Sequence, residues 1–315
     1  MRDRDRSFGV VALVVALAGL LSSGCGGAAA TASGGASSST GNANGDSFVV
    51  DLERPYVAGQ RYRVRNVVMR EEAQHATLGG RTVEDASHVT TIALRSVVEI
   101  VEVSAEGRAT LLRHQVEDAG LSMDGTPRPF LTSGQVIEVR TGATAEEAVV
   151  TIDGRPVGAE LLESLRGVLT LSHGGADEDR LFGSASPRRV GETWQPDLAA
   201  VAADLARATP FRLEPAHMAG EMRLMERRPD ESLVIEGGIT ATDVQMTNLP
   251  AGATLSATQL TIAMSGVLPE DPARHATSEA KGLEMSLTMN IPSPEGTVVM
   301  QMRMRMRGEL DREAL

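Results

Sequence analysis

The chain has 315 residues, with 30 Lys and Arg against 42 Asp and Glu, one Cys, and only one Trp, two Tyr and five Phe. The net charge of −12 at pH 7 argues against a nucleic-acid binder, which needs a cationic surface to replace counterions on phosphates. A single Cys excludes a disulfide framework and any Cys-based zinc site. The few aromatic residues disfavour stacking platforms for bases or sugars.

Residues 1–24 are expected to be a signal peptide. Arg2, Arg4 and Arg6 precede residues 10–21, an uninterrupted run of Val, Ala, Leu and Gly. Such a run fits the roughly 7–15 residues of a signal-peptide core. It is shorter than the roughly 20 residues that a membrane-spanning helix needs.

The apolar run ends in the letters LSSGC at residues 21–25, which resemble the lipobox of bacterial lipoproteins. The resemblance implies cleavage before Cys25, acylation of Cys25 with fatty acids such as palmitate, and a lipid anchor in the membrane. Ser22 stands where the family usually has Leu. Gly26, rather than Asp, follows the Cys, which implies sorting to the outer membrane, facing the periplasm or the cell surface. An ordinary secretory signal with an incidental Cys is the alternative.

Residues 25–47 are expected to be the lipidated Cys and a flexible tether. The stretch 26–46 reads GGAAATASGGASSSTGNANGD, which cannot bury enough apolar surface to fold.

From residue 48 onward the chain alternates apolar and polar residues, as strands with one buried face do. The clearest case is a long hairpin. Leu283, Met285, Leu287, Met289 and Ile291 alternate with polar residues, a turn follows at 292–296, and Met300, Met302, Met304 and Met306 alternate after it. The other expected strands are 61–70, 87–103, 108–117, 135–140, 148–152, 220–226, 233–246 and 255–268.

Two segments have helical spacing instead. Residues 159–171 place five apolar side chains on one face, and residues 197–208 follow Pro196, a suitable first helical residue. The segment 173–189 between them is expected to be a surface loop.

A short pattern occurs twice. Gly59 and Tyr62 recur as Gly191 and Trp194 after the same interval of 132 residues, and a long β-rich stretch follows each. We expect a duplicated β unit, with a chance echo as the alternative. The pattern resembles β-rich periplasmic lipoprotein families of unknown function and, more loosely, LolA-type half-barrels, in which a curved sheet wraps around helices and an apolar cavity.

The expected fold is therefore mainly β, or β-rich α+β, with long antiparallel strands in two half-barrel-like units and two short helices between them. The predicted divisions are 1–24, signal peptide; 25–47, lipidated Cys and tether; 48–157, first β-rich unit; 158–209, helical connector; and 210–315, second β-rich unit.

No enzyme motif is present in the sequence: it has no Gly-x-Ser-x-Gly, His-Glu-x-x-His, phosphate loop or Gly-x-Gly-x-x-Gly. The six His are isolated, so no local metal pair is visible, and we expect no metal or cofactor. The acidic run Asp177, Glu178 and Asp179 lacks the spacing of a calcium loop. A solvated loop is the simpler interpretation.

The Met-rich hairpin allows three interpretations. Thioethers bind Cu(I), but no His or Cys accompanies the run. Met also fills irregular cores and lines adaptable apolar surfaces. The six residues of the candidate ligand face are Met285, Met289, Met300, Met302, Met304 and Met306. We expect this face to pack on the two helices rather than to line an open cavity.

Two functions follow, both without catalysis. The first is an envelope lipoprotein with a structural or interaction role, anchored to the membrane at Cys25. The second is a periplasmic protein that binds a lipid or another apolar ligand. The expected partners are the membrane and either a lipid ligand or an envelope protein, without nucleic acid. An uncharacterised hydrolase is a third, weaker interpretation.

Overall fold

The computed structural model describes residues 46–172 and 178–315. Strands hold 61 % and helices 10 % of these residues. The prediction of a mainly β fold with long antiparallel strands is confirmed.

The strands follow the sequence pattern and extend it. In chain order they are β1 (Ser47–Val50), β2 (Arg61–Leu78), β3 (Arg81–Val103), β4 (Ala109–Met123), β5 (Thr126–Arg128), β6 (Val136–Arg140), β7 (Val149–Ile152), β8 (Arg155–Pro156), β9 (Ser184–Arg189), β10 (Thr193–Trp194), β11 (Phe211–Arg212), β12 (Met218–Arg227), β13 (Ser232–Thr242), β14 (Gln245–Met246), β15 (Thr254–Pro269), β16 (Ser278–Ser293) and β17 (Gly296–Ala314). The helices are α1 (Ala159–Arg166), α2 (Glu178–Phe182), α3 (Leu198–Ala208) and the 3-10 helix η3 (Pro215–His217).

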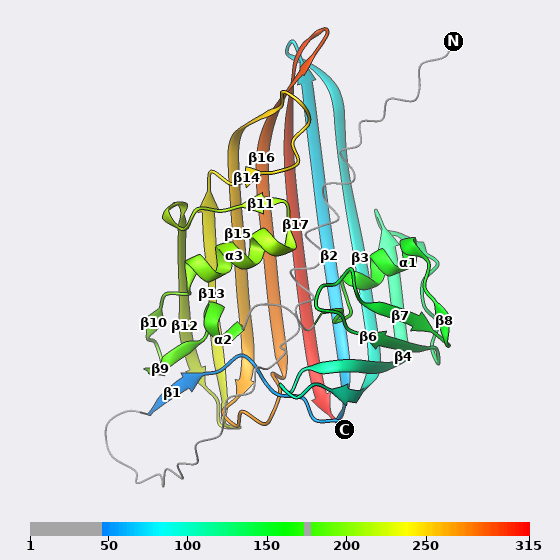
Figure 1. Cartoon of the computed structure of the whole chain (residues 1–315), viewed down its shortest axis with the longest axis vertical. Helices are drawn as coiled ribbons and strands as arrows, with labels where there is room; N and C mark the ends of the chain where they lie inside the picture. Colours follow the sequence, from blue (N-terminus) through cyan, green and yellow to red (C-terminus); the bar gives the residue numbers. More distant parts are fainter. Residues whose placement is uncertain (1–45, 173–177) are drawn as a thin grey trace.

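Most strands belong to one antiparallel sheet (Figure 1), in the order β10-β12-β13-β15-β16-β17-β2-β3-β4-β6-β7-β8, with β5 paired to β4. The C-terminal strand β17 pairs with β2, from Val298 opposite Leu78 to Ala314 opposite Tyr62. The two predicted β-rich stretches, 48–157 and 210–315, therefore share a single sheet. Two further pairs, β1 with β9 and β11 with β14, lie outside it.

The two faces of the sheet differ in chemistry. The inner face carries the alternate residues that form the core, such as Val68, Leu94 and Met304, all buried. The outer face carries ion pairs between neighbouring strands, among them Arg63 with Glu117, Arg113 with Glu138, Arg140 with Glu102, and Arg305 with Glu284. Exposed pairs of this kind contribute about 0–1 kcal/mol each to stability. The outer face therefore faces solvent, and apolar packing on the inner face supplies most of the stability.

Helix α3 covers the inner face on the side of β12 to β16 (Figure 1). Its N-cap Asp197 accepts a hydrogen bond from the backbone N–H of Ala200 at 2.9 Å, which satisfies a donor in the first turn. Val201 and Leu205 are buried in the same apolar cluster as the methionines of β16 and β17. Burying each such side chain stabilises the fold by about 1.5–3 kcal/mol.

Helix α1 is shorter than the predicted 159–171. It ends at Arg166, and the chain turns at Gly167, where the N–H groups of Val168 and Leu169 both donate to the carbonyl of Leu165. The side-chain amide of Asn66 donates to the Val168 carbonyl at 3.0 Å. This long-range bond gives the carbonyl a partner in the sheet in place of a further helical turn.

Three other predictions are corrected. The predicted loop 173–189 contains α2 and β9 within its described part, 178–189, because the backbone of this segment pairs with β1. The predicted strand 233–246 breaks after Thr242, where Asp243 has φ = 54°, and β14 then pairs with β11. Strand β16 passes Pro292 and reaches Ser293, so the turn is tighter than predicted.

The repeated sequence pattern corresponds to two turns with the same hydrogen bonds. Gly59 and Gly191 have φ of 83° and 89°, a conformation that favours glycine. The Gly59 N–H donates to the Ile100 carbonyl at 2.8 Å, and the Gly191 N–H donates to the Leu224 carbonyl at 2.7 Å. The aromatic residue three positions after each glycine, Tyr62 or Trp194, is buried.

The likeness extends to the hairpins that follow. The strand register shifts between Ile100 and Glu102 in β3, and between Leu224 and Glu226 in β12. Each hairpin then closes with a positive-φ residue, Gly107 in the first and Glu231 in the second. The two halves thus share the turn, the register shift and the hairpin geometry.

Candidate functional site

A hollow of the inner face lies between α1 and the sheet. We call it the α1 groove. Its volume is about 1240 Å³, its floor comes from β2, β3, β4 and β17, and its roof comes from α1. The floor includes Val68, Ile92, Leu121 and Met306, and Phe130 closes one side.

The strand register sorts the floor into rows. Val68 lies opposite Ile92, and Ile92 lies opposite Leu121, which makes one apolar row across three strands. Two residues along, Arg70 lies opposite Thr90. The floor therefore changes from apolar to polar along the strand direction.

Gly167, the residue that follows α1, is buried against the apolar row. A Cβ added at Gly167 would lie 3.7 Å from Val68 and 3.9 Å from Ile92, an ordinary van der Waals contact. The helix presents Leu161, Glu163 and Ser164 to the groove. Val68 and Ile92 are buried below this end of the helix, whereas Met123 on the floor is exposed and Leu121 is partly buried.

Charged groups of both signs line the groove. On the floor, Arg70 donates to Glu72, and Arg128 extends from β5, whose register places it opposite Leu121. On the roof, one carboxylate oxygen of Glu163 lies 3.6 Å from the Arg166 guanidinium. Apolar surface with a few charged groups is the composition of a ligand site.

The six methionines of the predicted ligand face are placed mostly in the core. Met285 lies opposite Met304 and Met289 lies opposite Met300, so the two strands share one Met face. Met285, Met289, Met300, Met304 and Met306 are all buried, and Met302 is partly buried. Met306 is the member of this set that also lines the α1 groove.

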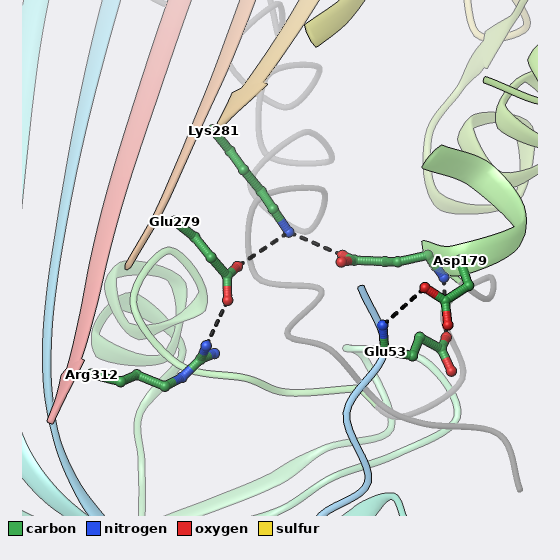
Figure 2. A network of polar contacts seen from close by, with 6 residues as sticks. Glu53, Asp179, Glu279, Lys281 and Arg312 are labelled. Atoms are coloured by element: carbon green, nitrogen blue, oxygen red, sulfur yellow. Dashed lines mark hydrogen bonds and ion pairs between the residues drawn. The ribbon is translucent and has the colours of Figure 1, made fainter. Parts of the chain in front are cut away.

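A second polar feature joins the N-terminal part of the described chain to the sheet (Figure 2). We call it the polar clamp. Its members are Glu53, Glu178, Asp179, Glu279, Lys281 and Arg312. The Lys281 ammonium donates to Glu178 at 3.0 Å, and Arg312 donates to Glu279 at 2.6 Å. The backbone N–H groups of Leu52 and Glu53 donate to Asp179.

The clamp is largely dry. The side chains of Lys281 and Glu178 are 17 % and 13 % exposed. Burial raises the pKa of Glu279, but the nearby charges of Arg312 and Lys281 outweigh burial and hold that pKa below its ordinary value. The sequence interpretation of Glu178 and Asp179 as part of a solvated loop is therefore wrong. Glu178 pairs with Lys281 of β16, and Asp179 accepts hydrogen bonds from the backbone of Leu52 and Glu53. Asp177 lies outside the described residues.

Two histidines are buried without charge. Burial lowers the pKa of His114 to about 4, and its Nδ1 lies 3.2 Å from the Ser96 hydroxyl. Burial, with Arg312 and Arg54 nearby, lowers the pKa of His275 to about 4. The His275 ring stacks on Tyr56 with centroids 4.3 Å apart.

Cys25, the predicted lipidation site, lies outside the described residues. Among residues 46–172 and 178–315, no helix is long and apolar enough to cross a membrane, and no three His, Cys, Asp or Glu side chains gather as a metal site would need.

The α1 groove was not predicted from the sequence. Val68, Ile92 and Met306 of its floor belong to predicted strands, whereas Leu121 and Met123 lie beyond the predicted strand 108–117. Only the pairing of β17 with β2 brings Met306 beside Arg70. The one local signal was the run of residues 127–130, which has two prolines and interrupts the β pattern; Arg128, Pro129 and Phe130 of this run line the groove.

Comparisons with known proteins assign no family. No family model matches the sequence, and no curated protein matches it either. Among solved structures, one titled "Lipid-protein interactions in lipovitellin" aligns with 82 % of this chain at 9 % identity and a TM-score of 0.35, and this chain spans 25 % of that protein.

Two further structures align more weakly. The alignment with DynF from the dynemicin biosynthesis pathway of Micromonospora chersina spans 91 % of this chain and 94 % of DynF, at 9 % identity and a TM-score of 0.17. The alignment with the di-domain ARO/CYC StfQ from the steffimycin biosynthetic pathway spans 74 % of this chain and 74 % of StfQ, at 15 % identity and a TM-score of 0.18. At these TM-scores, none of the three alignments transfers a function.

Proposed function

We propose that this chain is a lipid-anchored protein of the bacterial cell envelope that binds an apolar or amphipathic ligand in the α1 groove without catalysing a reaction. The observation that carries the proposal is the groove of about 1240 Å³ with an apolar floor. Small-molecule sites measure roughly 300–1,000 Å³ and are mostly apolar with a few polar groups, so the groove is large enough for a lipid-sized ligand.

Apolar side chains in the groove remain in contact with water. Met123 is 45 % exposed, and Leu121, Phe130 and Leu161 are partly buried. A ligand that covers them gains about 25 cal/mol for each Å² of apolar surface removed from water. The outer face, with its ion pairs, offers no such gain.

The anchor is proposed from the lipobox at residues 21–25. We expect Cys25→Ala to abolish metabolic labelling with palmitate and to leave precursor or soluble protein. Unchanged membrane partitioning of the Cys25→Ala chain in detergent extraction would contradict the anchor and leave the groove proposal standing.

The ligand is tested on the full chain purified from its own membranes. Lipid that is not covalently bound is extracted with solvent and quantified per protein by mass spectrometry. Ser164 is partly buried on the roof, so Ser164→Trp should fill the groove and lower the extracted lipid. Gln115 is exposed on the outer face of β4, so Gln115→Trp is the matched control. Equal lipid in all three proteins contradicts ligand binding in the groove.

A structural or interaction role is the second candidate. The burial of the Met face in the core favours it, because that apolar surface is already used for packing and is closed to a ligand. A lipid-free protein in the extraction experiment would favour this second role.

A further inference from the structure

We infer that the ligand of the α1 groove is an acyl-chain amphiphile with an anionic head group, bound with its chain against Leu121, Met123, Phe130 and Leu161 and its head group at Arg128, with Arg70 across the floor. This inference rests on the proposed ligand-binding function and names the ligand class.

The polarity of the floor gives the orientation. The row of Val68, Ile92 and Leu121 ends at Arg128, which lies opposite Leu121. Val68 and Ile92 are buried, so the apolar surface left to a ligand is that of Leu121 and, in the next row, Met123. Phe130 and Leu161 line the groove beside them. An apolar chain that covers these side chains therefore has Arg128 next to it.

The two guanidinium groups give the charge of the head group. Arg70 extends from β2, and Arg128 extends from β5. Three strand spacings separate β2 from β5, about 14 Å at about 4.8 Å each, so the two long side chains stand on either side of the floor. Arg128 is exposed on β5, and its guanidinium has five N–H donors. Hydrogen bonds from Val89 and His88 lower the pKa of the nearby Asp124, and the charge of Arg128 adds to that effect.

The acidic residues of the groove are on the opposite wall. Glu160 and Glu163 belong to α1. They disfavour an anion against the roof and so direct an anionic head group to the floor. Arg70 also has Glu72 beside it, so Arg128 is expected to contribute more of the head-group affinity than Arg70.

The inference is tested with the full chain in phosphatidylcholine nanodiscs and an uncharged probe, hexadecanol that carries a diazirine. Light attaches the bound probe to the protein, and unlabelled competitors reduce the labelling. The competitors are palmitate, hexadecyl phosphate and hexadecanol, which share a chain length and differ in the head group. We expect at least one anionic competitor to displace the probe at about tenfold lower concentration than hexadecanol, the size of a charge-assisted hydrogen bond.

The variants assign that difference to the floor. Arg128→Gln should remove most of the tenfold advantage and leave displacement by hexadecanol unchanged. The double variant Arg70→Gln with Glu72→Gln should remove the remainder without leaving an unpaired carboxylate. Arg303 lies on the outer face, where it pairs with Glu284, so Arg303→Gln should keep the full advantage.

Each outcome has one consequence. A larger advantage for palmitate than for hexadecyl phosphate supports a carboxylate head group, and the reverse supports a phosphate. Equal displacement by all three competitors overturns the inference about charge, although the groove still binds an apolar chain. A probe that does not label the parent chain overturns the proposed function itself.

Discussion

The inner face of the sheet is filled on one side and open on the other. Under α3, the side chains of the helix, of β11 and of β14 join the Met face of β16 and β17 in one buried cluster. Under α1, Leu165 is buried, but Met123 on the sheet stays exposed and lines the α1 groove. The same type of sheet surface thus serves as a core where it is covered and as a candidate site where it is not.

The largest expected change in the free energy of unfolding comes from placing a charge in the filled region of the inner face, and the open region provides the comparison. Met304 is 4 % exposed in the filled region, so Met304→Glu should bury a carboxylate and lower the free energy of unfolding by about 4 kcal/mol. Met123 is 45 % exposed on the groove floor, so Met123→Glu should change it by no more than about 0.5 kcal/mol. Urea denaturation of the full chain at pH 7 measures both. Similar losses in the two variants would break the distinction between core and groove.

The polar clamp is expected to give the next largest effect. Lys281→Met leaves Glu178 without its cation in a nearly dry setting and should cost about 3 kcal/mol. Adding Glu178→Gln to Lys281→Met should recover part of that loss, because the uncompensated carboxylate is removed. Arg307 is exposed, so Arg307→Met serves as the control. A double variant as unstable as Lys281→Met alone would mean that the two side chains are not coupled.

Acid is expected to act through the buried histidines. The pKa of His114 is about 4 in the folded chain and about 6.5 when unfolded, so the unfolded state binds more protons between these values. Stability should therefore fall as the pH drops from 6.5 to 4, by roughly 3 kcal/mol for this residue. The carboxylate of Glu279, whose pKa is lowered, adds its loss only below its ordinary value of about 4.5.

His114→Gln tests this assignment, because it removes the titrating ring and keeps a polar group near Ser96. Its melting temperature should fall less between pH 7 and pH 4.5 than that of the parent chain. The exposed His88 is the control, and His88→Gln should follow the parent. A His114→Gln chain that follows the parent pH profile would show that another group controls the acid response.

The duplicated turns should give the smallest effects, and equal ones. Gly59→Ala and Gly191→Ala each place a Cβ at a positive φ, where the added cost is about 1–2 kcal/mol. No neighbouring atom lies within 4 Å of either added Cβ, so the backbone conformation sets both costs. Thermal unfolding of the two variants measures them. A difference of several kcal/mol between them would contradict the equivalence of the two turns.

Local pattern predicted the strands and the two main helices because each has a period that a single segment shows. The alternation of Met300 to Met306 against Arg303 and its neighbours is visible without any partner strand. The pairing of β17 with β2 is not, since it joins residues more than 200 positions apart. That pairing places Met306 beside Arg70, so the floor of the groove could not be predicted from the pattern of any single segment.

The same limit applies to the segment 178–189. Its Gly, Asp and Ser content favoured a loop, whereas Lys281 and the backbone of Leu52 supply the partners that hold it in place. Likewise, the end of α1 depends on Asn66, a residue from a different strand. Elements that take their hydrogen bonds from distant segments are the ones the sequence pattern missed.

We propose that the open side of the inner face binds a ligand and that the filled side does not. The most direct test maps where the diazirine-bearing hexadecanol attaches to the full chain, by digestion and mass spectrometry. We expect attachment to peptides that contain residues 121–130 and 158–167, and loss of this attachment in Ser164→Trp. Attachment to the region of α3 or to the outer face, unaffected by Ser164→Trp, would contradict it.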